Sequence, residues 1–360
     1  MGLVLVIVIS GYFDMIILHK DNPIYSSHGK DNYLERFIGT DRDNKYKWSH
    51  IGGLYHEKFE TLFKSCGLDY KMSYYEDYPN IEGEYFFGRF AHAKSDKDIH
   101  KNIYPKLEKR FDNIWPNKIT YELYDEKIKQ FEWLESVGYS HLVDYEVVNS
   151  LEELYQKVKV GDVVKSSVGA SSGNLFLITE PKYCEYENLY ELIRECDENR
   201  LWNSNDNFFP AMIQPKYEGL VHKLFITNNY VYDKKWTQSC DTSEPLNFGV
   251  GHPDRKWINT NKTLSSYVTL KDELSQISIY NECLDIWDRL DTPNLCIDYI
   301  ETDLGGKIIE FSYLYTEPIP ASDFYGRYNF DKNKFENTEE NMNEISYNQV
   351  SSVLKEFNLV

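Results

Sequence analysis

A lysine ends an apolar run, and small residues follow it, in the stretch VVKSSVGASSGNLFLI from Val163 to Ile178. Lys165 could place a positive charge on a phosphate oxygen. The small residues would let backbone N–H groups approach phosphates closely, and Gly169 and Gly173 supply the backbone freedom that such a loop needs. The stretch lacks the Gly-Lys-Ser/Thr ending of a Walker A loop, and it is not a Rossmann fingerprint. A phosphate-binding loop and a plain Ser/Gly hairpin both fit the pattern.

Two acidic residues interrupt apolar runs in the stretch CIDYIETDLGGKIIEFSYLYTEP. Asp298 and Glu310 lie on two predicted strands that a tight turn joins. A carboxylate in a buried strand is costly unless it is paired or bound to metal. Mg²⁺ prefers one or two carboxylates together with phosphate oxygens and water. We therefore expect the two acids to face one another at a metal site; the alternative is a pair of edge-strand acids that point to solvent.

The elements that must position these residues alternate between strands and helices. Residues 1 to about 115 predict an α/β lobe, with a buried first strand from Leu3 to Ile9 and a helix from His56 to Gly67. A turn over Trp115, Pro116 and Asn117 precedes a helix predicted from Tyr124 to Val137, which Gly138 ends.

Ser150 and Glu153 form a capping box ahead of a short helix. Gly161 ends that helix, and the strand that carries Lys165 follows. The stretch AMIQPKYEG predicts a short strand and a loop, and a hairpin that turns at Asn228 and Asn229 comes next. A helix predicted from Leu274 to Leu290 precedes the strands with the two acids. The tail after about Asp331 is polar until the helix-like VSSVLKEF.

Composition limits the partners. The 360 residues carry a formal net charge of -19, which argues against nucleic acid or an anionic membrane as the main partner. Asp14 interrupts the first apolar run before it reaches the length of a membrane span. The six cysteines show no zinc-finger spacing, so free thiols in a reducing compartment are expected. These features predict a cytoplasmic protein.

The order of these features resembles the ATP-grasp superfamily, over roughly Ile114 to Pro320. The matching features are the Pro-Asn turn, the D-x-K helix, the capped helix, the VVK strand, the small-residue loop, the Q-P-K-Y hinge, the basic hairpin and the acids around Gly-Gly. The resemblance implies an α/β (α+β) ATP-grasp fold in which two α+β subdomains hold the nucleotide. We expect an N-terminal α/β lobe at 1–115, a small subdomain at 116–215, a C-terminal subdomain with the metal site at 216–330, and a tail at 331–360.

The resemblance also implies ligands for ATP and Mg²⁺. Two lysines would hold the α- and β-phosphates, and they correspond to Lys165 and to Lys127, which taken alone is an ordinary surface lysine. The loop Ser166–Asn174 would be the lid over the phosphates, with Ser167, Gly169, Ser171, Ser172 and Gly173 as its contacts. The hinge that grips adenine would include Gln214, Lys216, Tyr217 and Glu218. The metal ligands would be Asp298, Glu310 and Ser312.

Two positions depart from the pattern of the superfamily. Its metal motif usually ends E-x-N, whereas here Ser312 stands in the Asn position, and a hydroxyl is a weaker ligand for Mg²⁺ than a carboxamide oxygen. The usual Arg of the basic hairpin corresponds to Lys223, which keeps the charge but loses the bidentate fork. Lys223 and Lys234 would steady an acylphosphate, and Arg255 would face the acceptor substrate.

The implied reaction is ATP-dependent ligation of a carboxylate to an amine, with an acylphosphate intermediate and ADP as a product. The small-molecule substrates could be of amino-acid, peptide or aminosugar type. A small-molecule kinase on the same fold, or a nucleotide-binding or carbohydrate-binding protein without turnover, stays open at this point. The oligomeric state stays open as well, with a homodimer common among related folds.

Overall fold

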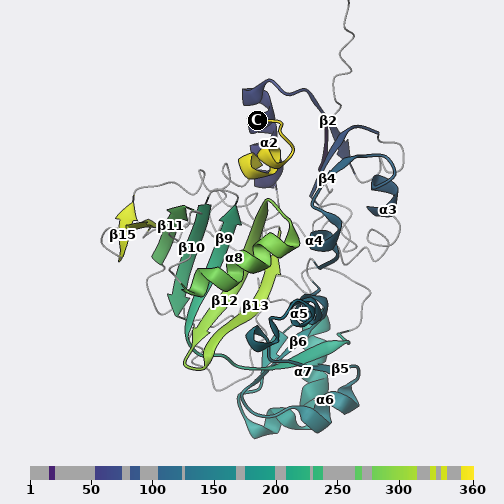
Figure 1. The fold of residues 1–360 in the computed structure, drawn as a ribbon. Coiled ribbons are helices and arrows are strands. Elements are labelled where there is room, and N and C mark those ends of the chain that lie inside the picture. Colours follow the sequence, from purple (N-terminus) through teal and green to yellow (C-terminus); the bar gives the residue numbers. More distant parts are fainter. Residues whose placement is uncertain are drawn as a thin grey trace, which may run out of the picture.

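The computed structural model of the chain describes residues 16–20, 53–74, 82–89, 104–123, 126–167, 175–198, 208–227, 230–237, 264–269, 278–313, 325–329, 334–338 and 350–360. Their strands form three sheets, one parallel and two largely antiparallel, with helices packed against them (Figure 1). The predicted mixed α/β class is therefore confirmed. The strand predicted from Leu3 to Ile9 lies outside the described residues. Within the described ranges, no helix combines the length and apolar character that a membrane span requires.

The first lobe is built on a parallel sheet with the strand order β2-β1-β3-β4. Helix α2 packs Phe59 and Phe63 into its core, as the amphipathic pattern from His56 to Gly67 predicted. The elements of this lobe are β1 (Ile16–Lys20), α2 (Gly53–Cys66), β2 (Tyr70–Tyr74), β3 (Tyr85–Arg89), α3 (Tyr104–Leu107) and β4 (Asn113–Trp115).

A helix from the far end of the chain, over residues 350–356, completes the core of the first lobe. Val350, Val353 and Leu354 are buried in the same cluster as Phe59 and Phe63. Figure 1 shows this yellow helix beside α2. The sequence pattern predicted a helix here but did not indicate where it packs.

The small sheet is antiparallel, with the strand order β5-β8-β6-β7, and it carries Lys165 at the end of a central strand. Val164, Leu154 and Leu189 belong to the core between this sheet and its two longer helices. Its elements are β5 (Glu146–Val148), α6 (Leu151–Lys157), β6 (Asp162–Ser166), β7 (Leu175–Leu177), η6 (Pro181–Cys184), α7 (Tyr186–Glu198) and β8 (Ala211–Pro215).

The large sheet has the strand order β13-β12-β9-β10-β11-β14-β15, so the strand that carries Glu310 lies at one edge. The predicted hairpin of the two acidic strands is confirmed. Its elements are β9 (Leu220–Thr227), β10 (Tyr230–Thr237), β11 (Leu264–Thr269), α8 (Ser278–Leu290), β12 (Asn294–Thr302), β13 (Gly305–Ser312), β14 (Tyr325–Asn329) and β15 (Lys334–Thr338).

The helix predicted from Tyr124 to Val137 begins later in the structure, at Lys127. The structure has α4 (Lys118–Leu123) and then α5 (Lys127–Ser136), followed by the short η5 (Ser140–Leu142). The reason is a change of hydrogen-bond partners. The backbone N–H of Lys127 donates to the Ser167 carbonyl at 2.7 Å, and the Leu123 carbonyl accepts from the side chain of Gln130 at 2.8 Å.

The capping box of α6 is confirmed in modified form. Ser150 Oγ accepts from the backbone N–H of Glu153 at 3.2 Å, as predicted. The Glu153 carboxylate returns to the backbone N–H of Asn149 at 2.9 Å, one residue before the usual position.

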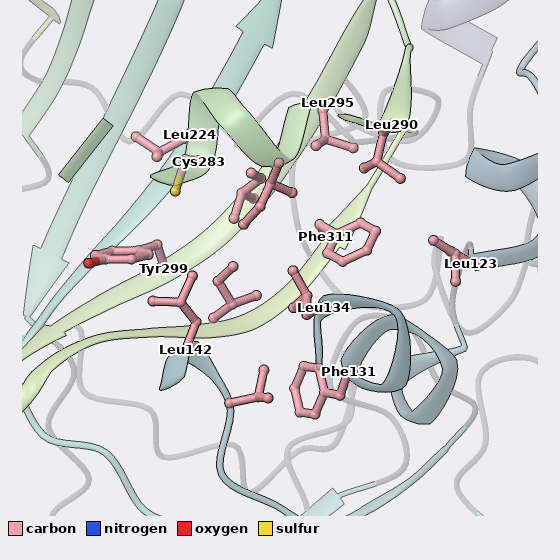
Figure 2. Close-up of a cluster of buried hydrophobic side chains, with 14 of the residues drawn as sticks. Leu123, Phe131, Leu134, Leu142, Leu224, Cys283, Leu290, Leu295, Tyr299 and Phe311 are labelled. Atoms are coloured by element: carbon pink, nitrogen blue, oxygen red, sulfur yellow. The ribbon is translucent and has the colours of Figure 1, made fainter. Parts of the chain in front are cut away.

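A single core joins α5, α8 and the large sheet, and Figure 2 shows its side chains. Phe131 and Leu134 of α5 lie in the same cluster as Phe311 of β13, and Cys283 of α8 is also buried there. Met212 of β8 belongs to this cluster too, so the small sheet is packed to the large one through a buried side chain.

The first lobe is tied to the start of β12 by polar side chains. Trp115 Nε1 donates to Asn294 Oδ1 at 3.2 Å, and Asn117 Nδ2 donates to the Leu290 carbonyl at 2.8 Å. The Asn117 Oδ1 atom accepts from the backbone N–H of Thr120, so the predicted turn also caps α4. These bonds fix the strand that carries Asp298 relative to the first lobe.

Replacing Leu354 by Ala is expected to lower the free energy of unfolding by about 2–5 kcal/mol, because this side chain is fully buried in the first-lobe core. The matched control is Leu304→Ala, since Leu304 is 94% exposed and its loss should change stability by less than about 0.5 kcal/mol. Urea unfolding followed by tryptophan fluorescence measures both, and equal stability of the two variants would contradict the packing of this helix.

Candidate functional site

The site begins with the two carboxylates. Asp298 of β12 pairs directly with Glu310 of β13, and the register shifts between Asp298 and Tyr299. Ile297 and Tyr299 belong to the core cluster, so Asp298 between them points to the opposite face of the sheet. The pairing of the two acids across a hairpin is confirmed, whereas their role as metal ligands stays a prediction.

Each carboxylate has a lysine beside it. Lys223 Nζ of β9 donates to both oxygens of Asp298, at 2.9 and 3.2 Å. Lys127 Nζ of α5 lies 3.3 Å from Glu310 Oε2. Two lysines predicted from distant parts of the chain therefore meet the two predicted acids.

Lys223 and Asp298 shift one another's titration. Burial acts to lower the pKa of Lys223, but the charge of Asp298 outweighs it, so the pKa of Lys223 is raised. Burial raises the pKa of Asp298 in spite of the attraction of Lys223, and the charge of Glu310 adds to the rise. Burial and the neighbouring carboxylate therefore both make the negative charge of Asp298 costly, and Lys223 offsets part of that cost.

Lys165 is the third lysine of the site. It lies on β6 opposite Met212 of β8, and its side chain is only 7% exposed. Burial lowers the pKa of Lys165 to about 8, and Lys127 acts in the same direction, while Glu310 and Asp298 act against it. The carboxylates and the other lysine therefore lie close enough for their charges to act on Lys165.

Gln130 is a residue of the site that sequence reasoning missed. Its side chain is fully buried, its Nε2 donates to the Phe311 carbonyl at 2.8 Å, and its Oε1 accepts from the Phe311 N–H at 3.0 Å. The amide therefore replaces a neighbouring strand at the open edge of β13, directly after Glu310. The sequence feature that could have identified Gln130 is its position three residues after Lys127, on the buried side of the helix.

The expected adenine hinge follows β8. Gln214 is 1% exposed, and its Nε2 donates to the Asp144 carbonyl at 3.3 Å, while its Oε1 has no hydrogen-bond partner among the described residues. Burial, followed by the charge of Asp144, raises the pKa of Tyr217, whose hydroxyl donates to Asp144 Oδ2 at 3.2 Å. Lys216 and Glu218 pair with each other at 3.4 Å near the surface.

Asp144 and Lys307 were not anticipated from the sequence. Lys307 Nζ of β13 lies 2.7 Å from Asp144 Oδ2, so Asp144 receives contacts from the hinge and from the large sheet together. The segment before β5, which contains Asp144, is therefore linked both to the hinge after β8 and to β13.

Ser167 is the second residue of the expected lid, Ser166–Asn174. Its backbone N–H donates to the Pro210 carbonyl at 2.9 Å, and its Oγ lies 3.5 Å from Glu126 Oε2, so the start of the loop is anchored to the helix that carries Lys127. The expected contacts Gly169, Ser171, Ser172 and Gly173 lie outside the described residues, as does Arg255.

Two further expected site residues are placed only in part. The backbone of Lys234 pairs with Lys223 in the β9–β10 ladder, while its side chain lies outside the described part of the structure. Ser312 pairs with Cys296, two residues beyond Glu310.

The donors present suit a hard cation that shares its ligands with a phosphate. Among the described residues, no group of three or more His, Cys, Asp or Glu side chains gathers as a complete protein cage for a metal. Two carboxylates and a nearby hydroxyl are instead the kind of partial set that Mg²⁺ uses together with phosphate oxygens and water.

Gln130→Leu is expected to lower the free energy of unfolding by about 3 kcal/mol, because it leaves the buried N–H and carbonyl of Phe311 without partners. Gln156→Leu on the exposed face of α6 makes the same chemical change at the surface and should be close to neutral. Chemical denaturation measures the stability of both variants. Equal stability of Gln130→Leu and its control would contradict the assigned hydrogen bonds of Gln130 to Phe311.

Near pH 7, Lys165→Met is expected to be more stable than the unchanged protein. This advantage in stability should become smaller as the pH rises. The folded-state pKa of about 8 lies below the usual value of 10.5, so the unfolded chain binds more protons between these values. Stability of the unchanged protein therefore rises with pH in this window, and the advantage of the variant should shrink by about 2 kcal/mol between pH 7 and 9.5. Urea unfolding at both pH values measures this, and a constant difference would rule out the lowered pKa.

No family model matches the sequence, and no curated protein matches it significantly. Solved structures do match. D-alanyl-alanine synthetase A from Vibrio cholerae aligns with a TM-score of 0.50 at 11% identity, covering 95% of this chain and 98% of that one.

Two further matches have slightly lower scores. D-alanine–D-alanine ligase from Bacillus anthracis aligns with a TM-score of 0.49 at 10% identity, covering 86% of this chain and 89% of that one. The ATP-grasp ligase PsnB, complexed with a variant of its minimal precursor, Mg and ADP, aligns with a TM-score of 0.48 at 10% identity. The alignment covers 96% of this chain and 99% of that one. With the synthetase covered almost end to end, the chain has the fold of the ATP-grasp superfamily.

Proposed function

We propose that the chain is an ATP-dependent and Mg²⁺-dependent ligase that joins a carboxylate to an amine through an acylphosphate, with ADP as a product. The observation that carries the proposal is the meeting of Asp298 and Glu310 with Lys127, Lys165 and Lys223, which come from four strands and one helix. A similar fold in a protein named as a synthetase supports ligation over the alternatives.

The hinge residues suit a nucleotide base. The buried Oε1 of Gln214 lacks a partner among the described residues, and a buried acceptor without a donor is costly. An exocyclic amino group, as in adenine, would supply that donor. Lys216, Tyr217 and Glu218 would complete the hinge around the base and ribose.

The lysines suit the phosphates. Lys165 and Lys127 would hold the α- and β-phosphates, and Ser167 with Gly169, Ser171, Ser172 and Gly173 would close over them. Burial lowers the pKa of Lys165, so its positive charge is disfavoured where it lies. A phosphate beside it would remove that cost, so binding and protonation of Lys165 would favour one another.

Asp298, Glu310 and Ser312 would hold Mg²⁺, which in its bound form neutralises charge on the phosphates and orients them. Gln130 fixes the backbone of the residue after Glu310, so the ligand strand is held in place before any ligand arrives. This fits the need of phosphoryl transfer for positioning and charge neutralisation.

In the proposed reaction a substrate carboxylate oxygen attacks the γ-phosphorus of ATP, and the bond to ADP breaks. The amine nitrogen of the second substrate then attacks the acyl carbon, phosphate leaves, and the amine loses a proton to solvent. Lys223 and Lys234 would steady the acylphosphate, Arg255 would bind an anionic acceptor, and the lid would exclude water from the acylphosphate. We expect amino-acid, peptide or aminosugar substrates, and the oligomeric state stays open.

The test is ³¹P NMR of the protein with Mg-ATP and pooled carboxylate and amine metabolites. Free phosphate and ADP that depend on both pools are expected. A new phosphoester signal would instead mean a kinase. Unchanged ATP together with no Mg-ATP binding in calorimetry would refute the proposal.

Asp298→Asn and Lys165→Ala are each expected to lower the rate of ATP turnover by about 100-fold or more. Lys165→Ala removes positive charge that stabilises the transferring phosphoryl group, and Asp298→Asn weakens the binding of the proposed Mg²⁺. Lys157→Met is the matched control, since it removes a lysine of α6 that is paired with Glu146 of β5 at 2.8 Å. Turnover in the double variant Lys165→Ala, Asp298→Asn at the unchanged rate would exclude this cluster as the active site.

A further inference from the structure

Both expected metal ligands are already paired in the structure. Lys223 binds both oxygens of Asp298, and Lys127 lies against Glu310. A divalent cation would use the same oxygen lone pairs that these ammonium groups occupy. Metal binding therefore requires that at least one of the two pairs opens.

The charge of the cluster disfavours a metal ion by itself. Three lysines, Lys127, Lys165 and Lys223, lie close enough to two carboxylates for their charges to act on one another, so the positive groups outnumber the negative ones. Adding a cation to a half-buried positive cluster is unfavourable, because charges in such places are weakly screened. A nucleotide brings several negative charges with the metal and reverses this balance.

The lysine side chains can move more readily than the two carboxylates. Asp298 and Glu310 sit on paired strands, and Gln130 holds the backbone next to Glu310. A lysine head lies at the end of a flexible four-carbon stem, and the Lys223 side chain is 27% exposed. Its ammonium group can therefore pass from a carboxylate to a nearby phosphate without a change in the sheet.

We propose that Lys127 and Lys223 are resident counter-ions of the metal site, which occupy Asp298 and Glu310 until phosphates draw them away. The metal is then accepted together with the nucleotide and is rejected without it. This inference rests on the proposed function, because it assigns the same two carboxylates to the metal. It adds an order of binding and a second role for the two lysines.

The experiment is a titration with Mn²⁺ alone, followed by the loss of the free Mn²⁺ signal in electron paramagnetic resonance. The unchanged protein is expected to bind Mn²⁺ weakly without nucleotide. Lys223→Met removes the competing ammonium group and one positive charge, so it should raise the affinity for Mn²⁺ alone by about tenfold or more. Asp298→Asn added to that variant should abolish the gain, which would assign the new binding to this carboxylate.

Lys157→Met is the matched control, because its lysine is also paired with a carboxylate and is similarly exposed, at 35%, but lies on α6, away from the cluster. It should leave the affinity for Mn²⁺ unchanged. Lys223→Gln is the second variant, in case Lys223→Met fails to fold by circular dichroism. An unchanged affinity for Mn²⁺ alone in the folded lysine variant would overturn the inference.

A separate arm repeats the titration with a non-hydrolysable ATP analogue and distinguishes the two proposals. Tight uptake of Mn²⁺ with the analogue by the unchanged protein is expected under both. Tight uptake without the analogue would overturn the counter-ion role and leave the proposed function intact. Failure to bind the analogue under any condition would overturn the proposed function and, with it, this inference.

Discussion

Two carboxylates side by side on neighbouring strands require positive charge close to them, and the rest of the structure supplies it. Asp298 and Glu310 face one another on a sheet whose other face is packed core, and the Asp298 side chain is only 15% exposed. Positive charge must come from outside the hairpin. It comes from β9, from the first turn of α5 and from the end of β6, so three separate parts of the chain converge on one hairpin.

That convergence also depends on hydrogen bonds from a neutral side chain to the backbone. An edge strand such as β13 has unpaired N–H and carbonyl groups, which invite slippage or association. The amide of Gln130 satisfies both groups of Phe311 and also takes the last carbonyl of α4. One neutral side chain thus fixes a helix, a strand edge and the separation between a lysine and a carboxylate.

Much of this arrangement could be predicted from the sequence, because local patterns determine it. The Gly-Gly turn between two apolar runs placed Asp298 opposite Glu310, and the capping box located α6. The break between α4 and α5 could not be predicted, since it depends on Ser167, which lies far along the chain and takes the N–H of Lys127. For the same reason the contact of Asp144 with Lys307 could not be predicted, because it joins an exposed aspartate to a largely buried lysine that is distant in the sequence.

The helix over residues 350–356 has a consequence for how the molecule is assembled. The parallel sheet of the first lobe is made early on the ribosome, yet Val350, Val353 and Leu354 fill its core. Contacts between such distant segments form slowly, because a long loop must close before they are made. The core of this lobe is therefore completed only after residues 116–349 have been synthesised, and its apolar surface stays partly uncovered until then.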